Sequence, residues 1–213
     1  MVHRGFAECA NTLAPIILRH IKAALDKIQP QNRDIEIVFT GHSAGGAVAS
    51  LLFCYFSTFQ VLATHQTIPT LSCISFGSPP ILTADMDLLI SQFSANNIFF
   101  GNFLAFVNDG DPIPCMDDTY AKKLASIWHS VGGSRPRRAE DLGAFVPPRL
   151  SLNCLGHLVC LIDRNAGSDE EDESLMACYL NHHQLEQRAW ANIWAHDMKQ
   201  YVNWITLLGN NFL

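Results

Sequence analysis

The chain has 213 residues, which is enough for one domain with a sizeable buried core. Hydrophobic residues make up 48% and charged residues 16%, against about 25% charged in typical soluble domains, and this composition argues against intrinsic disorder. The formal net charge of −6 leaves no global basic surface and so argues against nucleic-acid binding.

No apolar run reaches the roughly 18 residues of a membrane-spanning helix. The first twenty residues do not resemble a signal peptide, because their apolar run is short, contains Pro15 and leads to Arg19 and His20. The seven cysteines include no CxxC pair, and their odd number leaves at least one outside any intramolecular disulfide. This usage favours buried thiols in a reducing compartment.

The first half of the chain alternates between helix and strand patterns. Residues 6–28 have apolar positions at helical spacing, with charged positions between them, and Pro30 follows. Residues 35–40 are apolar on both faces, as in a strand buried in a parallel sheet. A glycine-rich turn at 41–46 leads into an apolar stretch that predicts a helix packed on that sheet.

Later segments continue the alternation. Further strands are predicted at 71–76, 102–107 and 157–162, with a short helix at 84–93. Surface loops are predicted at 133–149 and 167–174, and residues 175–208 are predicted to be helical with a break near 181–183. With no internal repeat, the pattern predicts one α/β domain over residues 1–213, with a mostly parallel sheet and helices on both faces.

Gly41–Gly45 fits the G-x-S-x-G motif, and it lies between a predicted buried strand and a predicted helix. That context is typical of a strained turn that exposes a nucleophilic serine, here Ser43. We expect Gly41 and Gly45 to be glycine because neighbouring backbone passes close to them. The amide of Ala44, at the helix N-terminus, would donate to a developing oxyanion. The simpler interpretation is a glycine-rich turn with an idle serine.

A nucleophilic serine needs an imidazole to take its proton and a carboxylate to orient that imidazole. In this type of fold the acid and then the histidine follow the serine in the chain. Asp109 and Asp111 both follow the strand predicted at 102–107, and either could instead serve the turn. The candidate histidines are His129, His157, His182, His183 and His196, and composition does not choose among them.

Four stretches together resemble the class 3, or fungal-type, lipase family of the α/β-hydrolase superfamily. VHRGF at 2–6 resembles its V-H-x-G-F segment, and the stretch at 38–51 resembles its serine turn, including His42 before the serine. FGSPP at 76–80 and FVNDGDPIP at 106–114 resemble its F-G-x-P corner and its acid loop. The resemblance extends over roughly residues 2–115.

This resemblance implies an α/β-hydrolase-type three-layer sandwich and a triad. It assigns Ser43 as the nucleophile and Asp111 as the acid, with Asp109 as a turn residue. The family histidine often lies in an H-x-M-x-x-Y pattern, which residues 196–201 match. His196 is therefore the expected base, ahead of His157.

The chain departs from the family pattern at its beginning. In the family, a strand ending in Gly-Ser or Gly-Thr supplies the first oxyanion donor, and a lid helix follows it. Here V-H-x-G-F begins at Val2, so we expect an N-terminally incomplete domain without that strand and lid. The compartment stays open: cytoplasmic for the chain as it stands, or secreted if a leader belonged to the missing segment.

The function implied is that of a serine ester hydrolase acting on acyl glycerides or related lipid esters, with transient contact with a lipid interface and no metal or organic cofactor. The missing oxyanion donor is expected to weaken the activity, since such a donor contributes about 10²–10³ in rate. The alternative is a catalytically impaired lipase-like domain that serves as a binding or scaffold module.

Overall fold

The computed structural model describes residues 2–28, 35–58, 62, 69–83, 100–130, 147–163, 175–187 and 190–210. Its helices are α1 (Arg4–Leu25), α2 (Ala44–Thr58), α4 (Asp118–Ser130), α5 (His182–Glu186) and α6 (Met198–Asn210), with short 3₁₀ turns η1 (Ile113–Cys115) and η3 (Ile193–His196). Its strands are β1 (Glu36–His42), β2 (Thr70–Phe76), β3 (Phe100–Asn108), β4 (His157–Asp163) and β5 (Leu175–Leu180).

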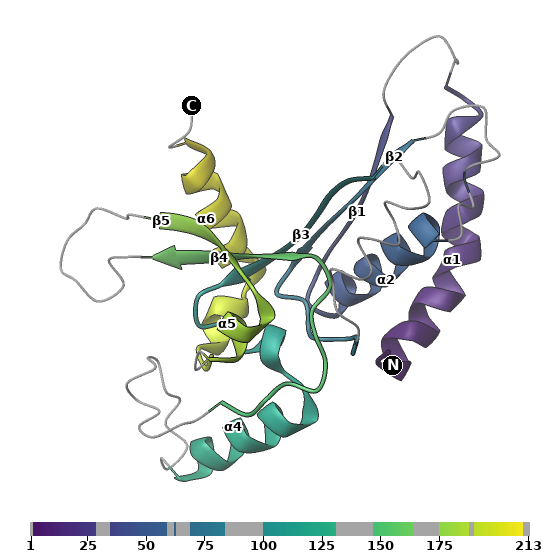
Figure 1. Cartoon of the computed structure of the whole chain (residues 1–213). Helices are drawn as coiled ribbons and strands as arrows, with labels where there is room; N and C mark the ends of the chain where they lie inside the picture. The colour runs from purple at the N-terminus through teal and green to yellow at the C-terminus, as the bar shows by residue number, and fades with distance from the viewer. Residues whose placement is uncertain are drawn as a thin grey trace.

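The five described strands form one sheet in the order β1-β2-β3-β4-β5. The first four strands are parallel to one another, and β5 is antiparallel to β4. The prediction of an α/β fold with a mostly parallel sheet is therefore confirmed. The parallel strands have their carboxyl ends at the same end of the sheet, where β1 leads into α2 and β3 leads into the acid loop (Figure 1).

One predicted element is wrong. Residues 175–180 form β5 rather than the beginning of a long helix, and Cys178 pairs with Cys160 of β4. Alternate β5 side chains point to the same side, so Cys178 and Leu180 pack into the interior while Tyr179 is exposed. Burial of one face against β4 and its neighbours decides the conformation of this segment.

Helices cover both faces of the sheet. On one face, α2 packs against β1 and β2, and α1 packs on α2. On the same face, α4 and α5 contribute to a second hydrophobic cluster that packs against β3, β4 and β5 (Figure 1). Phe76 and Phe106 point to the opposite face from Cys73 and Phe103, and Phe76 contacts Tyr201 of α6. Helices thus lie on both faces of the sheet, while the edge strand β1 leaves Glu36, Val38 and Thr40 exposed.

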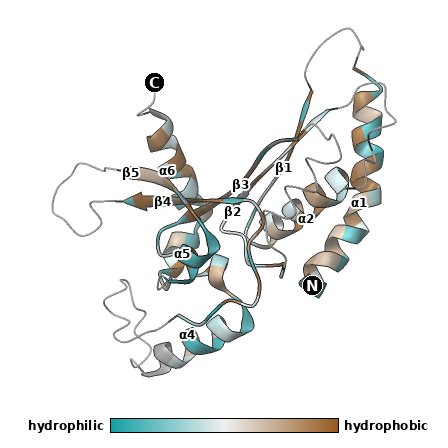
Figure 2. Cartoon of the chain, viewed as in Figure 1, coloured by the Kyte–Doolittle hydropathy of each residue, from teal (hydrophilic) through white to brown (hydrophobic). Residues whose placement is uncertain are grey.

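The sequence of each helix matches its place in these layers. α1 alternates hydrophobic and hydrophilic residues around its surface (Figure 2), and only one face of it is buried. α2 is apolar on almost every side, and Ala47, Phe53 and Phe56 are all but inaccessible to solvent. Burying a phenylalanine side chain of this kind contributes about 1.5–3 kcal/mol to stability.

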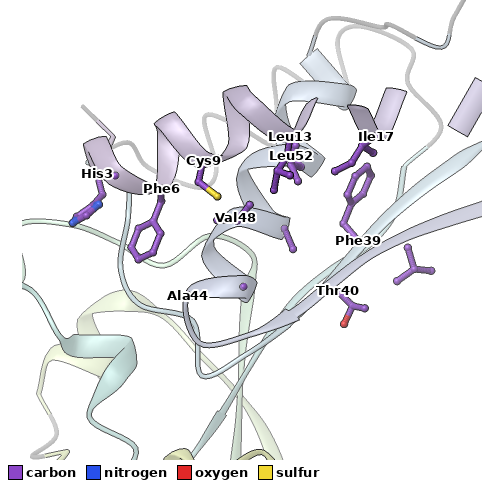
Figure 3. Close-up of a pocket in the computed structure, with 14 residues that line it drawn as sticks. His3, Phe6, Cys9, Leu13, Ile17, Phe39, Thr40, Ala44, Val48 and Leu52 are labelled. Atoms are coloured by element: carbon purple, nitrogen blue, oxygen red, sulfur yellow. The ribbon is translucent and has the colours of Figure 1, made fainter. Parts of the chain in front are cut away.

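β1 forms one edge of the sheet within the described part of the chain. Beside that edge lies a groove of about 760 Å³, which we call the α1–α2 groove. Apolar side chains of both helices face it, among them Phe6, Leu13, Val48 and Leu52 (Figure 3). Ala44 lies at one end of the groove, directly after the serine turn.

Several predicted features lie wholly or mostly outside the described residues: the helix at 84–93 and the loops at 133–149 and 167–174. The cysteines are free thiols, and four of the seven are buried. Burial raises the pKa of Cys54, Cys73 and Cys154 to about 12, so these thiols stay protonated near neutral pH.

Candidate active site

Ser43 occupies the sharp turn between β1 and α2. Its φ is 55°, and among the described residues it is the one non-glycine residue with a positive φ. Its backbone N–H donates to Phe76 O at 2.9 Å, and Gly46 N–H donates to Ser43 O at 2.9 Å. The left-handed conformation, which costs about 1–2 kcal/mol for an L-residue, is thus held in place by the neighbouring strand and by the helix.

The glycines of this turn divide into two kinds. A Cβ on Gly41 would lie 2.5 Å from Gly45 O and overlap its carbonyl carbon, as the sequence predicts. A Cβ on Gly46 would lie 2.9 Å from Gly41 O and 3.2 Å from Ser75 Cβ. For Gly45 the prediction is wrong: no atom lies within 4 Å of such a Cβ, because Gly45 lines the open α1–α2 groove.

Asp111 is completely buried in the loop after β3. Ile113 N–H donates to its Oδ1 at 2.9 Å, and Tyr201 O–H donates to its Oδ2 at 2.7 Å. The same Tyr201 oxygen accepts from Asn108 N–H at 3.1 Å. Burial and the nearby Asp111 carboxylate raise the pKa of Tyr201 well above its usual range, so Tyr201 remains a hydrogen-bond donor. These donors offset the desolvation of a buried carboxylate.

His196 completes this arrangement from η3. Its Nδ1 lies 2.9 Å from Asp111 Oδ2, and its side chain is 18% exposed. Gly77, at the end of β2, leaves the space for this contact. A Cβ on Gly77 would lie 2.7 Å from Asp111 Oδ2 and 2.8 Å from His196 Nδ1.

Ser43 is not hydrogen-bonded to this pair. Its Oγ and His196 Nε2 form no hydrogen bond with any residue in the described ranges. α2 begins at Ala44, and the first N–H groups of a helix have no acceptor within that helix. The Ala44 N–H can therefore donate to an anion next to Ser43, aided by the helix dipole.

A comparison with known protein families identifies the family of this chain. The family profile described as Lipase (class 3) matches residues 1–120, which is more than half of the chain. The chain belongs to the class 3 lipase family. The resemblance of the four motif stretches is thereby confirmed.

Solved lipase structures share the fold of this chain at low sequence identity. The triacylglyceride lipase of Rhizomucor miehei aligns with a TM-score of 0.53 at 16% identity, covering 92% of this chain and 57% of that lipase. The same organism's lipase in its propeptide complex aligns with a TM-score of 0.51 at 14% identity, covering 92% and 49%. Lipase II of Rhizopus niveus aligns with a TM-score of 0.50 at 16% identity, covering 92% and 57%.

This member of the class 3 lipase family thus spans about half the length of the solved structures that it matches. No curated protein matches it at the level of sequence. At these identities the structural likeness shows the fold alone.

The remaining candidates lie away from the Asp111–His196 pair. Asp109 is exposed in the turn after β3, where its N–H donates to Leu161 O. His157 is exposed at the opening of β4, the end of that strand away from the acid loop. His182 and His183 open α5, and the His129 side chain lies outside the described part of the chain.

Sequence reasoning gave no role to three residues that shape the site. Tyr201 was predicted only as part of a pattern, although its hydroxyl binds Asp111 directly. Asn108 holds the η3 backbone, because its Nδ2 donates to Ala195 O at 2.8 Å. Gly77 could have been noticed in the sequence because it directly follows the strand predicted at 71–76. In the structure its φ is 53°, a conformation that favours glycine.

Two further observations concern what the site and the helices can hold. In the described residues, no three His, Cys, Asp or Glu side chains lie close enough together to bind a metal ion. Of the helices in those residues, none is both long and apolar enough to cross a membrane.

Proposed function

We propose that this chain is a serine ester hydrolase that acts on acyl glycerides or related lipid esters. The observation that carries the proposal is the hydrogen bond between His196 and the buried carboxylate of Asp111, together with a strained, glycine-flanked serine at the end of β1. Membership of the class 3 lipase family supports the same chemistry.

The proposed reaction runs through an acyl-enzyme. Ser43 Oγ attacks the ester carbonyl carbon as His196 Nε2 takes its proton, and Asp111 stabilises the resulting imidazolium through Nδ1. The Ala44 N–H donates to the oxyanion. His196 then gives the proton to the leaving alcohol oxygen as the acyl C–O bond breaks. Water, deprotonated by His196, attacks the acyl-serine, and the acid and Ser43 are released.

The α1–α2 groove supports an apolar substrate. It begins at Ala44, next to the proposed oxyanion donor, and its lining is predominantly apolar. Apolar surface removed from water contributes about 25 cal/mol per Å², so a hydrocarbon chain in such a groove adds binding energy in proportion to its length.

The test is hydrolysis of p-nitrophenyl butyrate and tributyrin by the parent and by Ser43→Ala. Ser43→Ala is expected to lower kcat by about 10⁴-fold or more with little change in unfolding free energy, since Ser43 is only partly buried and its Oγ makes no hydrogen bond in the described ranges. Equal rates in parent and variant would exclude Ser43 as the nucleophile.

The second candidate is a lipase-like binding or scaffold domain with impaired catalysis. The absence of a hydrogen bond between Ser43 Oγ and His196 Nε2 favours it. A fluorophosphonate probe separates the two candidates, because it labels a serine only where an imidazole activates it. Labelling of the parent but not of Ser43→Ala supports the hydrolase, and an unlabelled parent supports the scaffold.

A further inference from the structure

His42 connects the serine turn to the segment that carries the proposed base. His42 is the last residue of β1 and directly precedes Ser43. Its Nε2 lies 2.7 Å from the backbone carbonyl oxygen of His196. Because a carbonyl oxygen only accepts, His42 donates from Nε2. This hydrogen bond ties residues that are 154 positions apart in the chain.

The same side chain also covers the imidazole of His196. The two ring centroids are 4.5 Å apart with an interplanar angle of 30°. Tyr201 meets the His42 ring edge-on, at 5.9 Å and 63°. Asp111 holds the His196 ring at Nδ1, so the ring is restrained at one edge by a carboxylate and on one face by a second imidazole.

The backbone of η3 is fixed at two neighbouring carbonyls. Asn108 Nδ2 donates to the carbonyl of Ala195, and His42 Nε2 donates to the carbonyl of His196. The Asn108 bond sets η3 relative to β3, where the acid loop begins. The His42 bond sets η3 relative to the serine turn. The distance between Ser43 and the His196 ring therefore depends on His42.

We propose that His42 is a positioning residue that holds His196 in register with Ser43. The inference rests on the proposed hydrolase function and names a determinant of its rate. Ser43 Oγ and His196 Nε2 are not hydrogen-bonded, so their approach is set by the surrounding frame and not by a bond of their own. A displacement of about 1 Å between reacting groups lowers rates by about 10²-fold.

Three substitutions separate the hydrogen bond from the ring contact. His42→Phe keeps an aromatic ring over His196 but has no donor. His42→Gln keeps an N–H at about the reach of Nε2, and His42→Asn carries the same amide on a shorter side chain. We expect His42→Phe to lower kcat for p-nitrophenyl butyrate by about 10–100-fold with KM within about twofold, and His42→Gln to recover most of that loss.

A merely structural role gives a different pattern. In that case His42→Phe and His42→Gln would lower kcat only in proportion to the unfolded fraction, and kcat per folded molecule would equal that of the parent. That result, or equal kcat in His42→Phe and the parent, overturns the proposal. Where His42→Phe does not fold, His42→Asn replaces it, and kcat equal to that of His42→Gln overturns the proposal.

A measurement without turnover keeps this test separate from the proposed function. The ring N–H proton between His196 Nδ1 and Asp111 is observable by NMR at low temperature. We expect its signal in the parent and in His42→Gln, and expect it broadened or lost in His42→Phe. An unchanged signal in His42→Phe overturns the positioning role even where the parent is active. Failure of the parent to react with the fluorophosphonate probe overturns the hydrolase assignment instead.

Discussion

Replacing Gly77 by alanine tests whether the space at the end of β2 is required by the Asp111–His196 pair. The added Cβ would lie 2.7 Å from Asp111 Oδ2 and 2.8 Å from His196 Nδ1, closer than real Cβ contacts come. Alanine at a φ of 53° adds about 1–2 kcal/mol of backbone strain. Since the clash is relieved only by moving one partner, the 2.9 Å hydrogen bond between them is expected to open.

The two contributions have different magnitudes and different assays. We expect a loss of about 1–3 kcal/mol in unfolding free energy, measured by urea denaturation. We expect kcat for p-nitrophenyl butyrate to fall by about 10²–10⁴-fold, because a catalytic imidazole without its oriented carboxylate loses up to about 10⁴ in rate. The loss of activity should thus greatly exceed what the unfolded fraction explains.

Gly209→Ala is the matched control. Gly209 lies exposed in α6, and no atom lies within 4 Å of its added Cβ. We expect unchanged kcat and a gain of up to about 1 kcal/mol in unfolding free energy, because alanine favours helix over glycine. If Gly77→Ala keeps the kcat of the parent, the packing of Gly77 against the acid–base pair does not govern activity.

Three further outcomes are expected. Asp111→Asn should lower kcat by orders of magnitude while Asp109→Asn stays within about threefold of the parent in the same ester assay, and the reverse order would contradict the assignment of the acid. Burial raises the pKa of Asp117, but hydrogen bonds from Ser151, Tyr120 and Thr119 outweigh this effect and leave the pKa below its usual range. The stabilisation of the folded state by the ionised Asp117 is therefore present above about pH 4 and is lost on acidification. Asp117→Asn should therefore lower unfolding free energy by about 1–2 kcal/mol at pH 7 and by less at pH 3, as measured by urea titration at both pH values. Cys9 is exposed, so Ellman's reagent should modify it first in the native protein, and Cys9→Ala should lack that fast phase, whereas all seven thiols react after denaturation.

The parallel part of the fold was predictable because local signals suffice for it. Residues 35–40 favour a strand and precede a glycine-rich turn, and this pattern depends on no distant segment. The predicted burial of both faces is wrong, because β1 lies at the edge of the described sheet and Glu36, Val38 and Thr40 are exposed. β5 was missed because LMACYL carries no strong alternation, and its conformation comes from pairing with β4 and from the cluster beneath. The pairing of one segment with another is not encoded in a short window of sequence.

The site divides in the same way. Ser43 could be predicted from a turn whose sterics are local, and the structure shows the expected conflict at Gly41. The choice of histidine could not be made from composition, because what distinguishes His196 is its 2.9 Å contact with Asp111, whereas His157 lies at the end of β4 away from the acid loop. Gly45 matches the motif, but the steric conflict expected there is absent, because no atom of the described residues lies within 4 Å of a Cβ placed on it.

The order of strands in the sheet sets the order in which the site can be assembled during synthesis. Each strand lies beside the one made just before it, so the sheet can grow as the chain leaves the ribosome. Ser43 belongs to the first strand–helix unit, whereas His196 and Tyr201 follow the last strand, about 150 residues later. At about 5–20 residues per second, roughly 8–30 s separate the two events. A nascent chain released before residue 196 would therefore contain a paired sheet and a strained serine, but no group to take the serine's proton.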